Sequence, residues 1–161
     1  MRESHFEREI KSPVVLETKF QVVPLWDVPS PLPTALSDDR PMVLVVDDEP
    51  VIADTLVEIL NKSGYAAIAA YDGEDALETA LLMPPELVIA DVGLPGISGI
   101  EVATVLREKL PECKVLLLSG QAATSRLAEP VKMDGKRFAV IGKPIHPKDL
   151  LAQVSESLKR Q

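Results

Sequence analysis

The sequence contains a single cysteine, Cys113, so no disulfide can form within the chain. This usage fits a reducing cytoplasm, and we interpret Cys113 as a small, partly buried residue just before a strand. No apolar run approaches the roughly 18 residues that span a bilayer, and the N-terminus lacks the apolar segment of a secretion signal. The sequence therefore predicts neither a membrane span nor export.

Basic residues are outnumbered, with 17 Lys and Arg against 25 Asp and Glu and a net charge of −8. Residues 1–40 carry 5 basic and 7 acidic side chains (−2), and residues 41–161 carry 12 and 18 (−6). Because both parts are acidic, neither is suited to hold nucleic acid by electrostatics alone. Only 4% of the residues are aromatic although 46% are hydrophobic, which indicates an aliphatic core typical of α/β proteins.

Residues 1–41 lack glycine altogether and hold 6 of the 14 prolines. The proline-rich stretch 28–33 predicts an extended linker of the polyproline type. Weak strand-like alternation upstream of it precedes the only tryptophan, Trp26. Three interpretations stay open, namely a docking arm, a flexible extension, or a native start at Met42. We expect a Pro-rich, flexible extension over residues 1–41 and a folded domain over residues 42–160.

Short apolar runs without polar alternation predict strands that are covered on both faces. Five such runs are the expected strands, at residues 43–46, 66–70, 87–90, 115–118 and 138–141. Helical spacing, caps and prolines predict helices at residues 50–63, 73–83, 98–110, 122–129 (the weakest) and 147–158. This alternation is typical of a doubly wound parallel sheet with helices on both faces.

Polar residues of definite kinds follow four of the five expected strands. In chain order they are Asp47 and Asp48, Asp91, Ser119, and Lys143. Because the carboxyl ends of parallel strands lie at one edge of a sheet, we expect these side chains to converge. Three carboxylates about 4 Å apart would repel by ~4 kcal/mol per pair, so such a cluster is costly without a cation. Oxygen ligands favour Mg²⁺ for that role.

The same residues suit the transfer of a phosphoryl group to a carboxylate. Asp91 would attack in line, and the Ser119 hydroxyl would donate to a phosphoryl oxygen. Lys143 and the divalent ion would neutralise charge on the phosphoryl oxygens. Little else is required of the protein beyond positioning and electrostatics.

Four motifs stand in order, each at the end of an expected strand. They are Val45-Val46-Asp47-Asp48-Glu49-Pro50, Asp91-Val92-Gly93-Leu94-Pro95-Gly96-Ile97-Ser98-Gly99, Ser119-Gly120 and Lys143-Pro144. Together they strongly resemble the receiver domain of bacterial two-component response regulators, in a single-domain form like the chemotaxis regulators. The resemblance covers about residues 41–159.

The resemblance implies a flavodoxin-like sheet of five parallel strands in the order 2-1-3-4-5. It also implies that a histidine kinase or histidine phosphotransfer protein phosphorylates Asp91. Asp48 and the Gly93 carbonyl would ligate Mg²⁺ directly, with Asp47 acting largely through water. The peptide between Lys143 and its following proline is expected to be cis.

The chain departs from the family pattern at three places. Val140 stands three positions before Lys143, where the family usually carries an aromatic residue whose movement reports phosphorylation. We hypothesise an altered switch in which Phe138, on the same strand face, substitutes imperfectly. The stretch between the fourth and fifth expected strands looks longer than usual. Gly93 and Gln121 occupy the positions that tune dephosphorylation in the family.

Other functions fit these residues less well. A flavodoxin-like cofactor binder needs a Ser/Thr- or Gly-rich phosphate loop after the first strand, where three acids stand instead. A haloacid-dehalogenase-type phosphatase needs a second aspartate two residues after the nucleophile, where Gly93 stands. The alternatives that remain are a receiver-fold scaffold that works without phosphorylation and a phosphate-sink receiver.

We therefore expect a cytoplasmic single-domain response regulator that is not an enzyme. It would signal by phosphorylation-dependent contact with an unknown downstream protein, because no output domain is expected after the last helix. Neither nucleic acid nor a membrane is an expected partner. The expected oligomeric state is a monomer or weak dimer.

Overall fold

The computed structural model of the protein describes residues 39–120, 129–133 and 135–159. The extension expected over residues 1–41 lies outside this part except for its last three residues, so it stays a prediction. None of the helices in the described ranges is long and apolar enough to cross a membrane.

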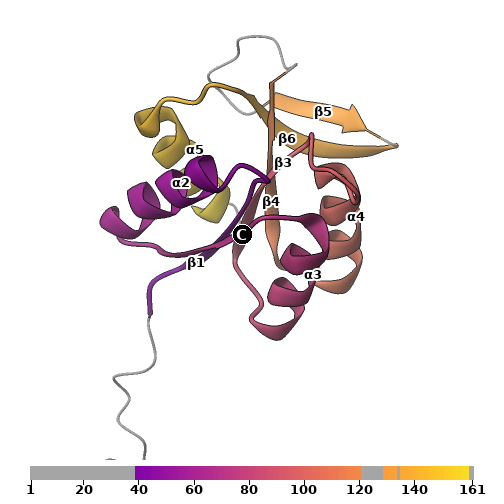
Figure 1. The fold of residues 1–161 in the computed structure, drawn as a ribbon, viewed down its shortest axis with the longest axis horizontal. Helices are drawn as coiled ribbons and strands as arrows, with labels where there is room; N and C mark the ends of the chain where they lie inside the picture. Colours follow the sequence, from indigo (N-terminus) through magenta and orange to yellow (C-terminus); the bar gives the residue numbers. More distant parts are fainter. Residues whose placement is uncertain (1–38, 121–128, 134, 160–161) are drawn as a thin grey trace, which may run out of the picture. The chain divides into compact units, whose positions relative to one another are not determined.

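A six-stranded sheet runs through the described domain, and five of its strands are the apolar runs that the sequence predicts (Figure 1). These five are β1 (Met42–Val46), β2 (Ala66–Ala70), β3 (Leu87–Asp91), β4 (Lys114–Ser119) and β6 (Lys136–Gly142). They are parallel and stand in the order β2-β1-β3-β4-β6, which corresponds to the expected order 2-1-3-4-5. The predicted flavodoxin-like, doubly wound fold is confirmed.

The helices of the described part cover both faces of this sheet (Figure 1). One face carries α2 (Pro50–Lys62) and α5 (Pro147–Lys159), and the other carries α3 (Gly73–Leu82) and α4 (Gly99–Lys109). Local signals set their ends as predicted. Ser98 and Glu101 form a capping box at the start of α4. Gly64 takes a φ of 94° after α2, as a left-handed cap does.

The core lies in two layers because successive strand residues point to opposite faces. In β1, Leu44 and Val46 pack under α3 and α4, whereas Val43 and Val45 pack under α2 and α5. All four are at most 1% exposed. Each such side chain contributes about 1.5–3 kcal/mol on burial, which explains why the strand has no polar alternation.

The sixth strand, β5 (Glu129–Met133), is one that the sequence does not predict. The weak helix expected over residues 122–129 falls outside the described residues except for Glu129. At Glu129 the expectation is wrong, because this residue belongs to β5. β5 pairs antiparallel with β6 at the edge of the sheet, and its hairpin includes Gly135 with a φ of 77°. Proline is tolerated in an edge strand, so Pro130 is compatible with β5.

Cys113 is buried directly before β4, in keeping with its interpretation as a structural residue. Burial raises the pKa of its thiol to about 11, against a smaller opposing effect from the neighbouring lysine. The thiol is therefore protonated at neutral pH and a poor nucleophile.

Candidate functional site

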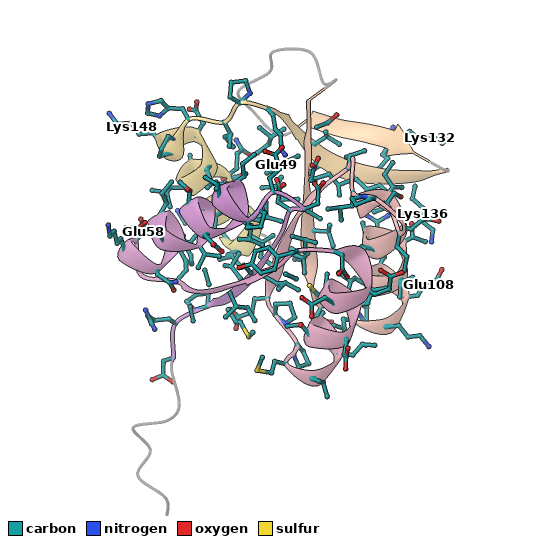
Figure 2. All side chains as sticks on the ribbon, in the orientation of Figure 1. Glu49, Glu58, Glu108, Lys132, Lys136 and Lys148 are labelled. Atoms are coloured by element: carbon teal, nitrogen blue, oxygen red, sulfur yellow. The ribbon has the colours of Figure 1, made fainter. Side chains whose placement is uncertain are left out.

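β1 ends in two aspartates with different surroundings. Asp47 is 1% exposed, and its Oδ1 accepts the Glu49 N–H at 3.0 Å. Its Oδ2 accepts a hydrogen bond from the Lys143 ammonium at 2.8 Å. Asp48 is exposed, as is Glu49, which Figure 2 labels beside α2. One carboxylate is therefore fixed by two donors, while the other is open to solvent or to an ion.

Asp91 is the last residue of β3 and lies at the same end of the sheet, where the carboxyl ends of the parallel strands meet. Its Oδ1 accepts the Gly93 N–H at 3.1 Å, and its Oδ2 lies 3.1 Å from the Lys143 Nζ. Val46 and Ala90 are partners in the pairing of β1 with β3. Asp47 and Asp91 each follow one of these partners, so their side chains emerge next to each other.

Lys143, in the loop after β6, links the two carboxylates. Burial by itself would lower the pKa of its ammonium, but the hydrogen bonds and charges of Asp47 and Asp91 outweigh that effect and raise the pKa above its ordinary value of 10.5. Lys143 is thus positively charged throughout the neutral range. Its peptide bond to Pro144 is cis, as the family resemblance implies.

The acidic cluster has the donor set of a divalent cation site. Asp47, Asp48 and Asp91 each offer an oxygen within 4.8 Å of the others. Oxygens on opposite sides of a Mg²⁺ are about 4.2 Å apart, because each Mg–O distance is about 2.1 Å. The carboxylates therefore fit such an ion after small adjustments, or with one of them reached through water. Asp47 suits the water-mediated contact, since it is the one buried carboxylate of the three and its Oδ2 already accepts a hydrogen bond from Lys143.

Ser119 lies at the end of β4, the strand between β3 and β6. β4 pairs with β3 through Leu118 and Asp91, and Ser119 itself pairs with Gly142. The Ser119 carbonyl accepts the Lys143 N–H at 2.9 Å, and the residue is 9% exposed. The residues that the sequence places at strand ends therefore share one edge of the sheet.

Gly99 ends the sequence motif that begins at Asp91, but the motif does not indicate its role. The structure shows that role. A Cβ at this position would lie 2.1 Å from the Asp91 carbonyl oxygen and 2.8 Å from its carbon. The Gly99 N–H donates to the Val92 carbonyl at 3.3 Å. The start of α4 therefore packs directly on the backbone of Asp91, and only glycine leaves enough room. Local sequence carries no signal for such a contact.

We expect Gly99→Ala to lower the free energy of unfolding by about 3 kcal/mol, because the strand end would have to move. Gly93→Ala is the matched control, since a Cβ there would meet Asp91 oxygens at 3.8 and 4.0 Å, which is ordinary contact. Urea unfolding of both variants measures the difference. Equal midpoints for Gly99→Ala and wild type would contradict the close packing.

Val140 and Phe138 lie on the same face of β6, and both are buried in the layer under α3 and α4. The Arg107 guanidinium of α4 lies 4.3 Å from the centre of the Phe138 ring, and its Nη2 donates to the Arg137 carbonyl at 2.6 Å. The sequence does not predict this contact, which fastens α4 to β6. The altered switch at Val140 stays a prediction, and Gln121 lies outside the described residues.

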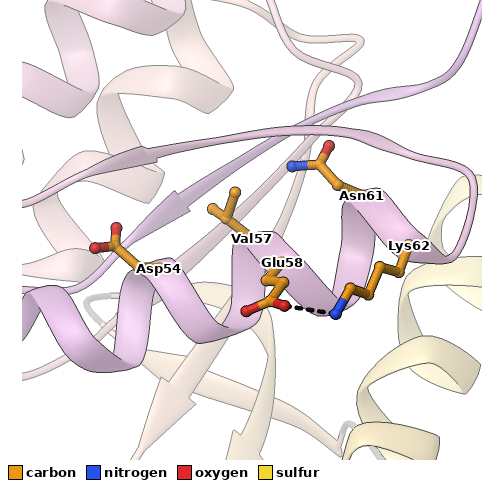
Figure 3. Close-up of a pocket in the computed structure, with 5 residues that line it drawn as sticks. All are labelled: Asp54, Val57, Glu58, Asn61 and Lys62. Carbon is orange, nitrogen blue, oxygen red and sulfur yellow. Dashed lines mark hydrogen bonds and ion pairs between the residues drawn. The ribbon is translucent and has the colours of Figure 1, made fainter.

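Two surface hollows in the described part are not lined by the acidic cluster. One, of about 550 Å³, is lined by residues of α2, namely Asp54, Val57, Glu58, Asn61 and Lys62 (Figure 3). The other, of about 520 Å³, is lined by Pro41, Glu86, Glu112, Lys114 and Leu158. Pro41 and Glu86 directly precede β1 and β3, so this second hollow lies at the opposite end of the strands from the carboxylates.

Comparison with known proteins gives a consistent result. The family model described as the response regulator receiver domain matches residues 43–155. The chain is similar to a CheY-like receiver domain protein from Methanospirillum hungatei JF-1, at 26% identity over 74% of this chain and 94% of that chain, with a TM-score of 0.66. It is similar to the receiver domain of Francisella response regulator 1452, at 26% identity over 75% and 98%, with a TM-score of 0.64. The chemotaxis protein CheY4 of Vibrio cholerae matches at 26% identity over 74% and 99%, with a TM-score of 0.64.

Proposed function

The chain belongs to the response regulator receiver domain family, and we propose that it accepts a phosphoryl group on Asp91 from a histidine kinase or histidine phosphotransfer protein. The family is one of phosphoacceptor signalling domains rather than classical enzymes. The observation that carries the proposal is the position of Lys143, whose ammonium contacts the Asp91 carboxylate at 3.1 Å and the buried Asp47 carboxylate at 2.8 Å. The carboxylate of Asp91 and the ammonium of Lys143 thus lie together with two further acids at the carboxyl ends of the strands.

In the proposed reaction, a carboxylate oxygen of Asp91 attacks the phosphorus of a phosphohistidine on the donor protein. The new P–O bond forms as the P–N bond breaks, and the imidazole nitrogen leaves with the electron pair. Lys143 stabilises the negative charge of the phosphoryl oxygens, and the Ser119 hydroxyl donates to one of them. Mg²⁺ bound by Asp48, Asp91 and the Gly93 carbonyl, with Asp47 through water, would neutralise further charge there.

The contacts around Asp91 support this assignment of roles. The Gly93 N–H and the Lys143 ammonium hold the two carboxylate oxygens, so the acceptor is oriented before the donor arrives. Asp47, buried and bonded on both oxygens, fixes Lys143 in turn. Little rearrangement of the protein is then required when the phosphoryl group is transferred.

We infer that the phosphorylated form signals by contact with a downstream protein, in the cytoplasm, as a monomer or weak dimer. One observation favours a second candidate, a receiver that serves as a phosphate sink. Val140 stands where an aromatic ring would report phosphorylation, and a valine side chain has no ring to reorient.

The test is incubation of the full chain with acetyl phosphate and MgCl₂, followed by intact-mass spectrometry and peptide mapping. We expect one phosphoryl group on the peptide that contains Asp91, and none when the Mg²⁺ is chelated. Glu78→Gln, which changes an exposed carboxylate on α3, is the control and should be phosphorylated like wild type. A wild-type protein that takes up no phosphoryl group under these conditions would overturn the proposal.

A further inference from the structure

The first residue of α3 lies in unusually close contact with the loop that follows Asp91 and leads to α4. A Cβ at Gly73 would lie 2.7 Å from the Ile97 carbonyl oxygen, 2.9 Å from the Ile97 Cβ and 3.2 Å from Val102 Cγ2. Gly73 is itself buried. The α3 start and the β3–α4 loop, which are distant in sequence, therefore touch through a position that has no side chain.

The backbone conformation does not explain this glycine. Gly73 is not among the residues with positive φ, in contrast to Gly96 in the neighbouring loop at 72°. Alanine favours a helix more strongly than glycine does, so helix formation alone would prefer a side chain here. The remaining reason is space, because a Cβ would overlap the Ile97 backbone.

We propose that Gly73 is a positioning residue for the phosphoacceptor, acting through Ile97; this inference rests on the proposed role of Asp91. The lack of a side chain at Gly73 allows the α3 start to support the loop and so fixes the direction of the Asp91 carboxylate. The residue touches neither the phosphoryl group nor the ion.

The loop can transmit a displacement at Ile97 to Asp91 because close packing and a hydrogen bond hold its two ends together. Gly99, two residues after Ile97, packs on the Asp91 backbone and donates to the Val92 carbonyl at 3.3 Å. The Val92 N–H donates to the Leu118 carbonyl at 2.8 Å. Pushing Ile97 away from α3 therefore moves a closed unit that includes the acceptor.

The start of α3 is held in place by its cap and by its buried side chains. The Asp72 carboxylate caps α3 by accepting the Asp75 N–H at 2.8 Å, and Ala76 and Ala80 anchor the helix in the core. A methyl group added at Gly73 would need about half an ångström more room than the 2.7 Å contact leaves. We expect the loop to move rather than the helix, and a displacement of about 1 Å at a reacting group can slow a reaction by 10²-fold.

The test compares Gly73→Ala with Glu74→Ala, an exposed change in the same helical turn. Three quantities are measured on the full chain, namely the rate of phosphorylation by acetyl phosphate with Mg²⁺, the urea unfolding midpoint, and the backbone amide NMR spectrum. We expect Gly73→Ala to stay folded in the assay, with a midpoint lowered by less than that of Gly99→Ala, and yet to be phosphorylated about tenfold more slowly. Its amide shifts should concentrate in residues 91–99. Glu74→Ala should match wild type in rate.

Two results would overturn the inference while leaving the proposed function intact. One is a wild-type rate for Gly73→Ala. The other is a slower rate that merely follows a lower midpoint, with amide shifts spread over the domain. Failure of the proposed function looks different, because wild type itself would then take up no phosphoryl group.

A second pair of variants decides the matter if Gly73→Ala does not fold. Ile97→Ala keeps the Cβ that rests on Gly73, whereas Ile97→Gly removes it. We expect Ile97→Ala to retain a rate near wild type and Ile97→Gly to be slower. Equal rates for the two would overturn the inference.

Discussion

Asp91→Asn is expected to take up no phosphoryl group and yet to be more stable than wild type when divalent ions are absent. The amide that replaces the carboxylate is not a nucleophile for phosphorus, so phosphorylation is lost completely. The stability change has the opposite sign because the native carboxylate stands among like charges. Function and stability should therefore separate at this residue.

The sign and size of this stability change follow from the distances between Asp91 and its charged neighbours. At an effective dielectric of about 20, the 3.1 Å contact between Asp91 and Lys143 corresponds to roughly 5 kcal/mol of attraction. Repulsion by Asp47 and Asp48, each with an oxygen no more than 4.8 Å away, amounts to roughly 7 kcal/mol together. The repulsion exceeds the attraction, so removing the charge should raise the free energy of unfolding by up to roughly 2 kcal/mol.

Urea unfolding with EDTA and with MgCl₂ measures this effect. Wild type should gain stability from Mg²⁺, because an ion that binds only the folded state shifts the equilibrium towards it. Asp91→Asn should gain little, and Glu78→Gln should behave like wild type. If Asp91→Asn were less stable than wild type in EDTA, repulsion by Asp47 and Asp48 could not outweigh the attraction to Lys143.

Lys143→Met is expected to lower the free energy of unfolding by about 3 kcal/mol at neutral pH without Mg²⁺. The substitution leaves Asp47, which is 1% exposed, without its cationic partner and beside two other acids. It also removes the cation that would stabilise the phosphoryl oxygens, so phosphorylation should slow by about 10²-fold or more. Mg²⁺ should bind more tightly, because no ammonium then competes for the carboxylates.

The pH dependence of this effect has a definite sign. Asp47 and Asp91 raise the pKa of Lys143, so its stabilising effect is complete below the ordinary value of 10.5 and is lost as the pH rises through the raised pKa. The difference between wild type and Lys143→Met should be constant across the neutral range and shrink in strong alkali. Lys148→Met, which removes an exposed lysine of α5, is the control. Urea midpoints that are equal for the two variants would contradict the role given to Lys143.

The sheet was predictable because its signal is local. Residues 43–46 and 87–90 are continuous apolar runs, and a strand of this kind is stable only when both of its faces are covered. β5 carries no such signal, since residues 129–133 include a proline and two charged residues. Its structure depends on pairing with β6, which is a tertiary contribution that overrides local propensity.

The sequence by itself determined which chemical groups stand at the strand ends, and parallel strands then bring those groups to one edge. Only the tertiary structure decided how they are held, with Asp47 buried and doubly bonded and Lys143 between two carboxylates. It also decided that Gly73 and Gly99 have no room for a side chain. The physical reason is that hydrophobic periodicity and capping depend on neighbours along the chain, whereas close approach of two backbones depends on packing between distant segments.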